Sequence, residues 1–243
     1  MFFMFPNEVA MLCSGAAATV AGVVSYGSSY PYSQVFGPGL VRGPAGSGRA
    51  ALTFDDGPTP PYTDRILDIL RASKATATFF VNGKQVDLFP DTLRRIQAEG
   101  HTIGNHTYSH LFLYFKTRGR IAREIDRTQE SIEKVTGERP TLFRPPYGVR
   151  WFGLFPVLNA RQMKDIQWSN PSFDWVAGMS PAKVIRKALE RIGDGSVILM
   201  HDGCGSRQPG EVDRSSTVAA LPAIIEGVQR AGLRFVSISE FVS

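Results

Sequence analysis

Two adjacent carboxylates end the apolar run in "ALTFDDGPTP", where Asp55 and Asp56 stand directly before a Gly-Pro turn. Neighbouring like charges repel each other, and a strand end seldom gains from them. A plain surface turn is the alternative, because Asp-Gly-Pro is ordinary turn chemistry. The pair therefore indicates a site only if other polar groups converge on it.

The chain has four histidines, and two of them, His106 and His110, lie four residues apart in "NHTYSH". One helical turn or a tight loop would let both imidazoles reach one ion. With a carboxylate they form a three-ligand set that leaves a position for water, as in catalytic zinc sites. Loop histidines that bond to backbone are the alternative. These donors also suit cobalt or nickel, so the residues do not choose the metal.

Two further segments bring groups that suit the same chemistry. In "LFRPPYGVR" two prolines stiffen a loop that carries Arg144 and Tyr147. Such a loop can present an arginine to a carboxylate and a backbone N–H to an oxyanion, although a barrel-closing turn is the structural alternative. The apolar run "GSVILMHDG" ends at His201 and Asp202.

Short apolar runs alternate with amphipathic helical patterns from Arg49 onward. The predicted strands are Ala50–Phe54, Ala77–Val81, Thr102–Asn105, Thr141–Phe143, Asp165–Trp168, Val197–Met200 and Arg234–Val236. Strands that alternate with helices predict a parallel α/β sheet covered by helices, open or closed into a barrel. Chemistry in such folds gathers at the carboxyl ends of the strands, where the residues singled out above lie.

Four motifs, "TFDDG", "HTYSH", "RPPYG" and "LMH", follow one another in this order. Together they make the stretch from Arg49 to Ser243 resemble the polysaccharide deacetylase family, also called the NodB-homology domain or carbohydrate esterase family 4. The resemblance implies a distorted (β/α)7 barrel with mainly parallel strands. It also implies a hydrolase that uses a divalent metal, usually Zn²⁺, to remove acetyl groups from chitin, chito-oligosaccharides, peptidoglycan or xylan.

The resemblance assigns roles to the clustered side chains. It implies that Asp56, His106 and His110 hold the metal and that Asp55 is the general base. His201 would then protonate the departing amine, because an amine anion is not a viable leaving group. The substrate of such a site is an acetylated glycan, and the products are acetate and a free amino sugar.

One motif, "WSNPSFDW", departs from the family pattern. Asp174 and Trp175 match it, and with Tyr147 they are expected to contact the substrate; the Tyr147 N–H and Arg144 are also expected to serve catalysis. The family usually carries an earlier carboxylate that orients the acid histidine, and that position falls near Asn170 or Pro171. An Asn170 side chain could still accept a hydrogen bond from this histidine, but without supplying a charge.

The bulk composition excludes some classes of protein. The net charge of the 243 residues is +5, but Lys and Arg are interspersed with Asp and Glu, which does not favour nucleic acid as a partner. Cys13 and Cys204 form neither a disulfide framework nor a cysteine zinc site. We expect residues 1–48 to be a hydrophobic arm or membrane anchor plus linker, and residues 49–243 to be the catalytic domain.

The N-terminal stretch Val9–Tyr26 has no charge and is about long enough to cross a bilayer, but no Lys or Arg precedes it. A weak secretory signal or membrane anchor, and an arm that packs on the domain, therefore both stay open, and a membrane-associated or extracytoplasmic place is favoured over the cytoplasm. Two other functions stay open. The altered motif favours a glycan-binding protein with a decayed site, and an amidohydrolase of a small amide would use the same scaffold on another substrate. The sequence fixes neither the polymer nor the oligomeric state.

Overall fold

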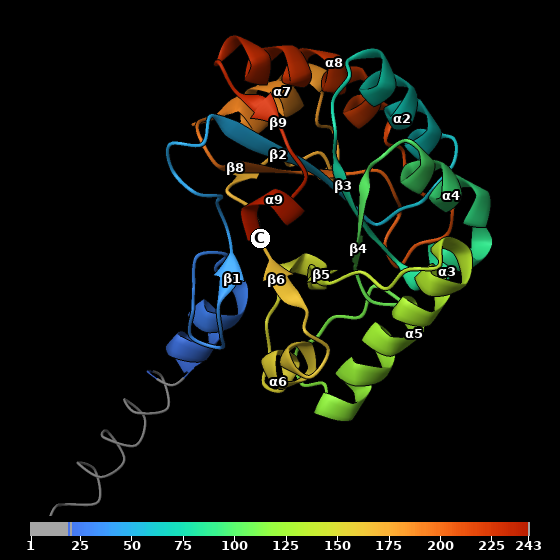
Figure 1. The fold of residues 1–243 in the computed structure, drawn as a ribbon. Coiled ribbons are helices and arrows are strands. Elements are labelled where there is room, and N and C mark those ends of the chain that lie inside the picture. Colours follow the sequence, from blue (N-terminus) through green and yellow to red (C-terminus); the bar gives the residue numbers. More distant parts are fainter. Residues whose placement is uncertain (1–18, 20, 243) are drawn as a thin grey trace, which may run out of the picture.

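The structure is a computed structural model that describes residue 19 and residues 21–242. Its centre is a curled sheet in which every strand pair is parallel (Figure 1). Within the described residues the strand order is β1-β6-β5-β4-β3-β2-β8-β7, and β9 pairs with β2. The strands are β1 (Gly39–Leu40), β2 (Arg49–Asp55), β3 (Thr78–Val81), β4 (Thr102–Asn105), β5 (Leu142–Phe143), β6 (Lys164–Ile166), β7 (Asn170–Pro171), β8 (Ser196–His201) and β9 (Arg234–Phe235).

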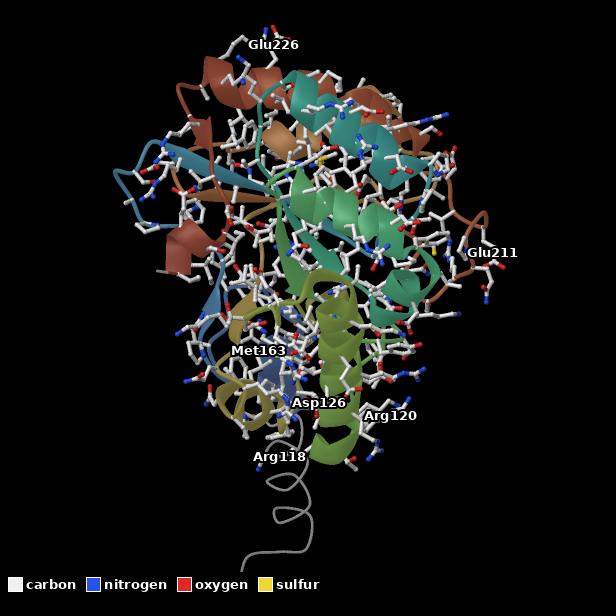
Figure 2. All side chains as sticks on the ribbon, turned by 45° about the vertical axis from the view of Figure 1, so that its right-hand side comes forward. Arg118, Arg120, Asp126, Met163, Glu211 and Glu226 are labelled. Atoms are coloured by element: carbon white, nitrogen blue, oxygen red, sulfur yellow. The ribbon has the colours of Figure 1, made fainter. Side chains whose placement is uncertain are left out.

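Most helices cover the outer side of the curled sheet, where labelled charged side chains such as Arg120 and Glu226 reach outward (Figures 1 and 2). The short C-terminal helix lies on the inner side, and its Phe241 packs into the inner core with Ala51. Helices begin where the sequence offers helix starts; Ser180, for example, accepts a hydrogen bond from the N–H of Lys183, and Pro181 follows it at the first helical position. The helices are α2 (Tyr62–Ala72), α3 (Gly83–Leu88), α4 (Pro90–Ala98), α5 (Arg118–Thr136), α6 (Leu154–Asn159), α7 (Pro181–Leu189), α8 (Ser215–Arg230) and α9 (Ser239–Val242), with one 3₁₀ turn at Pro146–Gly148 and further helical residues at 21–29.

Strand β2 shows how the sequence builds two apolar layers. Alternate side chains of a strand point to opposite faces, and almost all of β2 is buried. Leu52 and Phe54 pack into the core under the helices, whereas Ala51 packs into a second core inside the curl. Asp55 lies on the inner side with Ala51, at the carboxyl end of the strand, where function is expected in this class of fold.

Residues 164–171 connect the two edges of the sheet. Strand β6 pairs with β1 and β5, and after three intervening residues β7 pairs with β8. The N–H of Ser169, between them, donates to the carbonyl of Val197 at 3.1 Å. The expected α/β fold is therefore confirmed as an all-parallel curled sheet that forms a half-barrel, consistent with a distorted (β/α) barrel. Strands β1 and β7 were not predicted, because Gly39–Leu40 and Asn170–Pro171 carry no apolar run that indicates a strand.

The described part of the N-terminal segment packs on the rest of the chain. Arg150 is buried and donates to the carbonyl of Ser33 at 2.5 Å and to the carbonyl of Tyr30. Most of the stretch 9–26 lies outside the described residues, and among those described no helix has the length and apolar character that a bilayer crossing needs. The domain boundary near residue 49 stays a prediction.

Asp165 on β6 is a buried carboxyl group with an unusual pKa. Burial raises its pKa to about 6, although the charges of Arg150 and Arg144 and a hydrogen bond from Gln167 oppose the shift. An aspartate in the unfolded chain titrates near pH 4. The folded state therefore holds this proton more tightly than the unfolded state, and the protein loses stability as the pH rises between these two values.

Replacing Asp165 with asparagine should remove that loss, because the amide does not ionise. The difference in unfolding free energy, variant minus wild type, should therefore grow as the pH rises from 4 to 7. We expect this growth to be on the order of 1–3 kcal/mol. Urea unfolding of both proteins at a series of pH values measures this difference. A difference that does not change with pH would contradict the assignment.

Candidate active site

A pocket of about 330 Å³ gathers side chains from five segments at the carboxyl ends of the strands. Its size lies within the usual range for a small-ligand site. The strand register contributes directly, because β2 and β8 pair Asp55 with His201. The sequence-predicted residues that line the pocket are Asp55, Asp56, His106, His110, Tyr147, Trp175 and His201.

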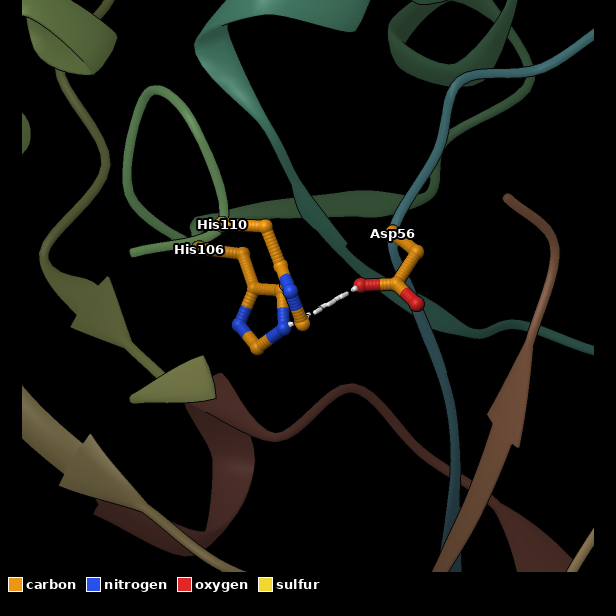
Figure 3. Close-up of side chains that lie close together, drawn as sticks. All are labelled: Asp56, His106 and His110. Carbon is orange, nitrogen blue, oxygen red and sulfur yellow. Dashed lines mark ion pairs between the residues drawn. The ribbon is translucent and has the colours of Figure 1, made fainter. Parts of the chain in front are cut away.

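Asp56, His106 and His110 converge at one side of this pocket (Figure 3). Asp56 Oδ1 lies 3.4 Å from His106 Nε2 and 3.1 Å from His110 Nε2. One ligand atom from each residue can be chosen so that all three lie within 4.8 Å of one another. Asp56 and His110 have positive φ values of 80° and 55°, a conformation that costs energy for residues with a side chain and is often found at functional sites.

The surroundings of these three residues fit a bound cation. Asp56 Oδ1 is buried and has no hydrogen-bond partner among the described residues, although a buried carboxylate oxygen normally has one. His106 Nδ1 donates to the carbonyl of Arg144 at 2.7 Å, which leaves the Nε2 lone pair directed at Asp56. Burial would raise the pKa of Asp56, but the two histidines that face its carboxylate, His110 foremost, hold that pKa well below its usual value. One ionised carboxylate and two imidazoles suit a divalent transition metal.

Asp55 stands beside this cluster in a buried ion pair. Its Oδ1 lies 2.7 Å from Arg144 Nη1, and both side chains are almost fully buried. The Arg144 guanidinium also donates to the hydroxyl of Thr53 and to the carbonyls of Ile166 and Gln167, at 2.8, 3.2 and 2.9 Å. Because these bonds fix the guanidinium from two sides of the barrel interior, Arg144 holds the Asp55 carboxylate in one position.

His201 lies opposite, with its own carboxylate partner. Its Nδ1 donates to Asp174 Oδ1 at 2.8 Å, and Asp174 Oδ2 accepts from the His201 N–H at 2.8 Å and from the Thr217 hydroxyl at 2.7 Å. Burial would lower the pKa of His201, but the charge of Asp174 and its hydrogen bond raise it above the ordinary value. Asp174 was expected to contact substrate; here its oxygens are occupied by this histidine and Thr217.

The expected hydrogen bond between Asn170 and His201 is not present. The Asn170 amide donates to the carbonyls of Glu190 at 2.8 Å and Ala188 at 3.4 Å, and its oxygen accepts from Ser169. The register of β7 and β8 pairs Asn170 with Ile198, three residues before His201. The expectation of a neutral partner for this histidine was therefore wrong, because Asp174 supplies a charged one.

Two exposed aromatic rings form walls of the pocket. The ring of Tyr147 packs edge-on against His110, with centroids 4.6 Å apart. The ring of Trp175 packs in the same way against His201, at 5.0 Å. The two rings thus line the pocket beside His110 and His201.

Sequence inspection missed Arg214, which is buried beside the cluster and lines the pocket. Its Nε donates to the carbonyl of Gly203 at 2.8 Å, and its Nη2 lies 3.9 Å from Asp56 Oδ2. Arg214 thereby fixes the segment after His201 over the site. A single arginine in a polar loop before a helix offers no pattern that would have identified it.

Comparisons with known proteins agree with this geometry. The polysaccharide deacetylase family matches residues 42–159. A peptidoglycan-N-acetylglucosamine deacetylase of Bacillus cereus is 37% identical over 196 residues, which are 81% of this chain and 69% of the relative. A chitooligosaccharide deacetylase of Azorhizobium caulinodans is 34% identical over 74% of this chain and 88% of its own length.

A similar solved structure is the Bc1960 peptidoglycan N-acetylglucosamine deacetylase in complex with an N-hydroxybenzamide compound. Its TM-score is 0.76 at 35% identity, and the match covers 83% of this chain and 91% of that one. Identity of this extent, together with the shared fold and the clustered motifs, defines the relationship. The chain belongs to the polysaccharide deacetylase family and is a hydrolase of that kind.

Proposed function

We propose that this hydrolase removes the N-acetyl group from N-acetylglucosamine units of a peptidoglycan or chito-oligosaccharide glycan and releases acetate. The observation that carries the proposal is the convergence of Asp56, His106 and His110 beside the buried carboxylate of Asp55 in one pocket. Two relatives support this substrate class, because their names give peptidoglycan N-acetylglucosamine and chito-oligosaccharides as what they deacetylate.

Asp56, His106 and His110 would hold the metal, for which we propose Zn²⁺. A divalent cation at this position supplies a positive charge that polarises the acetyl carbonyl and lowers the pKa of water. The chain fixes its ligands in advance through the bond from His106 to the Arg144 carbonyl and through the backbone turns at Asp56 and His110. Co²⁺ or another divalent ion would fit the same donors.

Asp55 would act as the general base. It takes the proton of the water that attacks the acetyl carbon, and a carboxylate can do this only while it is ionised and correctly oriented. The Arg144 guanidinium, 2.7 Å from Asp55 Oδ1, fixes the direction of this carboxylate. The Tyr147 N–H would donate to the developing oxyanion.

His201 would act as the general acid. It donates a proton to the sugar nitrogen as the bond between nitrogen and the acetyl carbon breaks, which gives acetate and a free amine. Asp174 is a positioning residue in this account, because it holds Nδ1 and leaves Nε2 to face the pocket. Trp175 would pack against the sugar ring, since its ring is 41% exposed beside His201.

Replacing Asp174 with asparagine should move the alkaline limb of the pH profile to lower pH. The acid must be protonated to work, and Asp174 raises the pKa of His201 against the effect of burial. Without that charge the histidine loses its proton at lower pH, and we expect the alkaline limb to move in that direction. Measuring kcat/KM for acetate release against pH tests this. An unchanged limb would show that Asp174 does not tune the acid.

An acetate-release screen tests the proposed function itself. Purified protein with Zn²⁺ would be offered chitin oligosaccharides, peptidoglycan fragments and small amides, each with and without a chelator. We expect metal-dependent acetate from the glycans and little from the small amides. Preference for a small amide would support the amidohydrolase, and glycan binding without release would support a decayed site. The altered motif no longer favours the latter, because Asp174 partners His201.

A further inference from the structure

Aromatic side chains continue outward from the pocket in unbroken contact. The Tyr147 ring contacts Phe112 with centroids 5.5 Å apart, and Phe112 stacks on Tyr114 at 5.4 Å. Tyr114 contacts Trp151 at 4.9 Å, and Trp151 contacts Phe152 at 5.1 Å. Phe115 packs on both Tyr114 and Trp151. We call this set the aromatic strip: Tyr147, Phe112, Tyr114, Phe115, Trp151 and Phe152.

The strip is exposed at its surface and supported from below. The exposed fraction is 48% for Phe112, 81% for Phe115 and 58% for Phe152. Tyr114 and Trp151 are partly buried and pack against the apolar core that α5 and α6 share. Contiguous exposed apolar surface of this kind usually marks a binding site, because folding alone would bury it.

The backbone at Phe115 adds an independent sign of function. Its φ is 57°, in the left-handed region that is unfavourable for a bulky side chain. The turn is closed by the Lys116 N–H, which donates to the Leu113 carbonyl at 3.1 Å. Glycine would adopt this turn without strain, so the ring at position 115 weakens the fold without being buried. A binding role explains why a phenylalanine stands there.

We propose that the aromatic strip binds the sugar residues that flank the deacetylated unit of a glycan chain. The proposal rests on the proposed function, because it takes the catalytic pocket as one end of the binding surface. Tyr147 belongs to both, since it lines the pocket and packs on His110. The faces of aromatic rings carry partial negative charge and attract the C–H faces of pyranose rings. The three exposed phenylalanines of the strip add no hydrogen-bonding group, so they recognise sugar faces and not particular hydroxyls.

An anionic lipid surface is the competing occupant. Arg118 and Arg120 stand at the beginning of α5, close in sequence to Phe115 (Figure 2). Aromatic rings next to basic residues also occur where proteins contact membranes. Continuity with the pocket favours the glycan, because a linear polymer can occupy the pocket and the strip together.

The test compares a short and a long substrate. Wild type should have a higher kcat/KM on the hexasaccharide of N-acetylglucosamine than on the disaccharide. In Phe152→Ala and Phe115→Gly, both away from Tyr147, we expect kcat/KM on the hexasaccharide to fall about tenfold, with the disaccharide value unchanged. The melting temperature of Phe115→Gly should stay equal or increase, because glycine relieves the turn. Phe152→Tyr, which keeps the ring, should behave as wild type, as should Leu88→Ala, which removes an exposed apolar side chain elsewhere.

Hexasaccharide affinity measured by calorimetry in the presence of a chelator separates this proposal from the proposed function. Tighter binding by wild type than by the two variants supports the strip, even if no substrate releases acetate. Equal affinities and equal chain-length ratios in wild type and variants would overturn it. Lost binding to phosphatidylglycerol vesicles with unchanged hexasaccharide affinity would also overturn it and assign the strip to lipid.

Discussion

Replacing Asp55 with asparagine should lower kcat for acetate release by about 10²- to 10⁴-fold. The amide cannot accept the proton of the attacking water, whereas its size and its contact with Arg144 at one oxygen are retained. Asp55 is not one of the three clustered ligand residues, so zinc content should remain that of wild type. Single-turnover and steady-state acetate assays, with metal analysis of the same samples, measure both quantities.

The control for this prediction is Asp91→Asn, which removes a carboxylate that is 94% exposed on α4. Its kcat should match wild type. If Asp55→Asn keeps full activity, proton removal does not depend on this carboxylate, and the proposed mechanism fails even if the metal site is correct.

Replacing His110 with alanine should weaken zinc affinity by more than about 100-fold and abolish activity at stoichiometric zinc. Loss of outer-sphere partners alone typically costs about 10- to 100-fold in metal affinity, and this change removes one of three protein ligands. Competition with a chromogenic chelator measures the affinity. High zinc concentration should restore part of the activity, since the other two ligands and the base remain.

His101→Asn is the matched control for the histidine change. His101 is also buried, but it precedes β4 and its Nδ1 faces the N–H of Ala77, away from the pocket residues. Its zinc affinity should equal that of wild type. If His110→Ala binds zinc as tightly as this control does, His110 is not a ligand.

The parts of the site that follow from strand periodicity could be predicted from the sequence. Asp55 ends a strand whose alternate residues enter the two cores, so its place at the carboxyl end of a buried strand followed from the apolar run. The four-residue spacing of His106 and His110 indicated that both could reach one ion, and the tight loop with its left-handed residues achieves this.

The partner of His201 could not be predicted, because it depends on the register of two strands and on one turn. Because Pro171 pairs with Leu199, Asn170 lies beside Ile198 and does not reach His201. Phe173 then adopts a φ of 57°, and the next residue, Asp174, meets the histidine. Sequence spacing does not determine such a register. The aromatic strip was hidden for a similar reason, since its rings come from segments separated in the chain.

Titration of metal-free protein with Zn²⁺, while acetate release from N-acetylglucosamine hexasaccharide is recorded, tests the central claim most directly. The account predicts no activity before zinc is added, a linear rise that ends at one zinc per chain, and no comparable rise for His110→Ala. Full activity of the metal-free protein would contradict the account. The same rise to one zinc per chain in His110→Ala as in wild type would also contradict it.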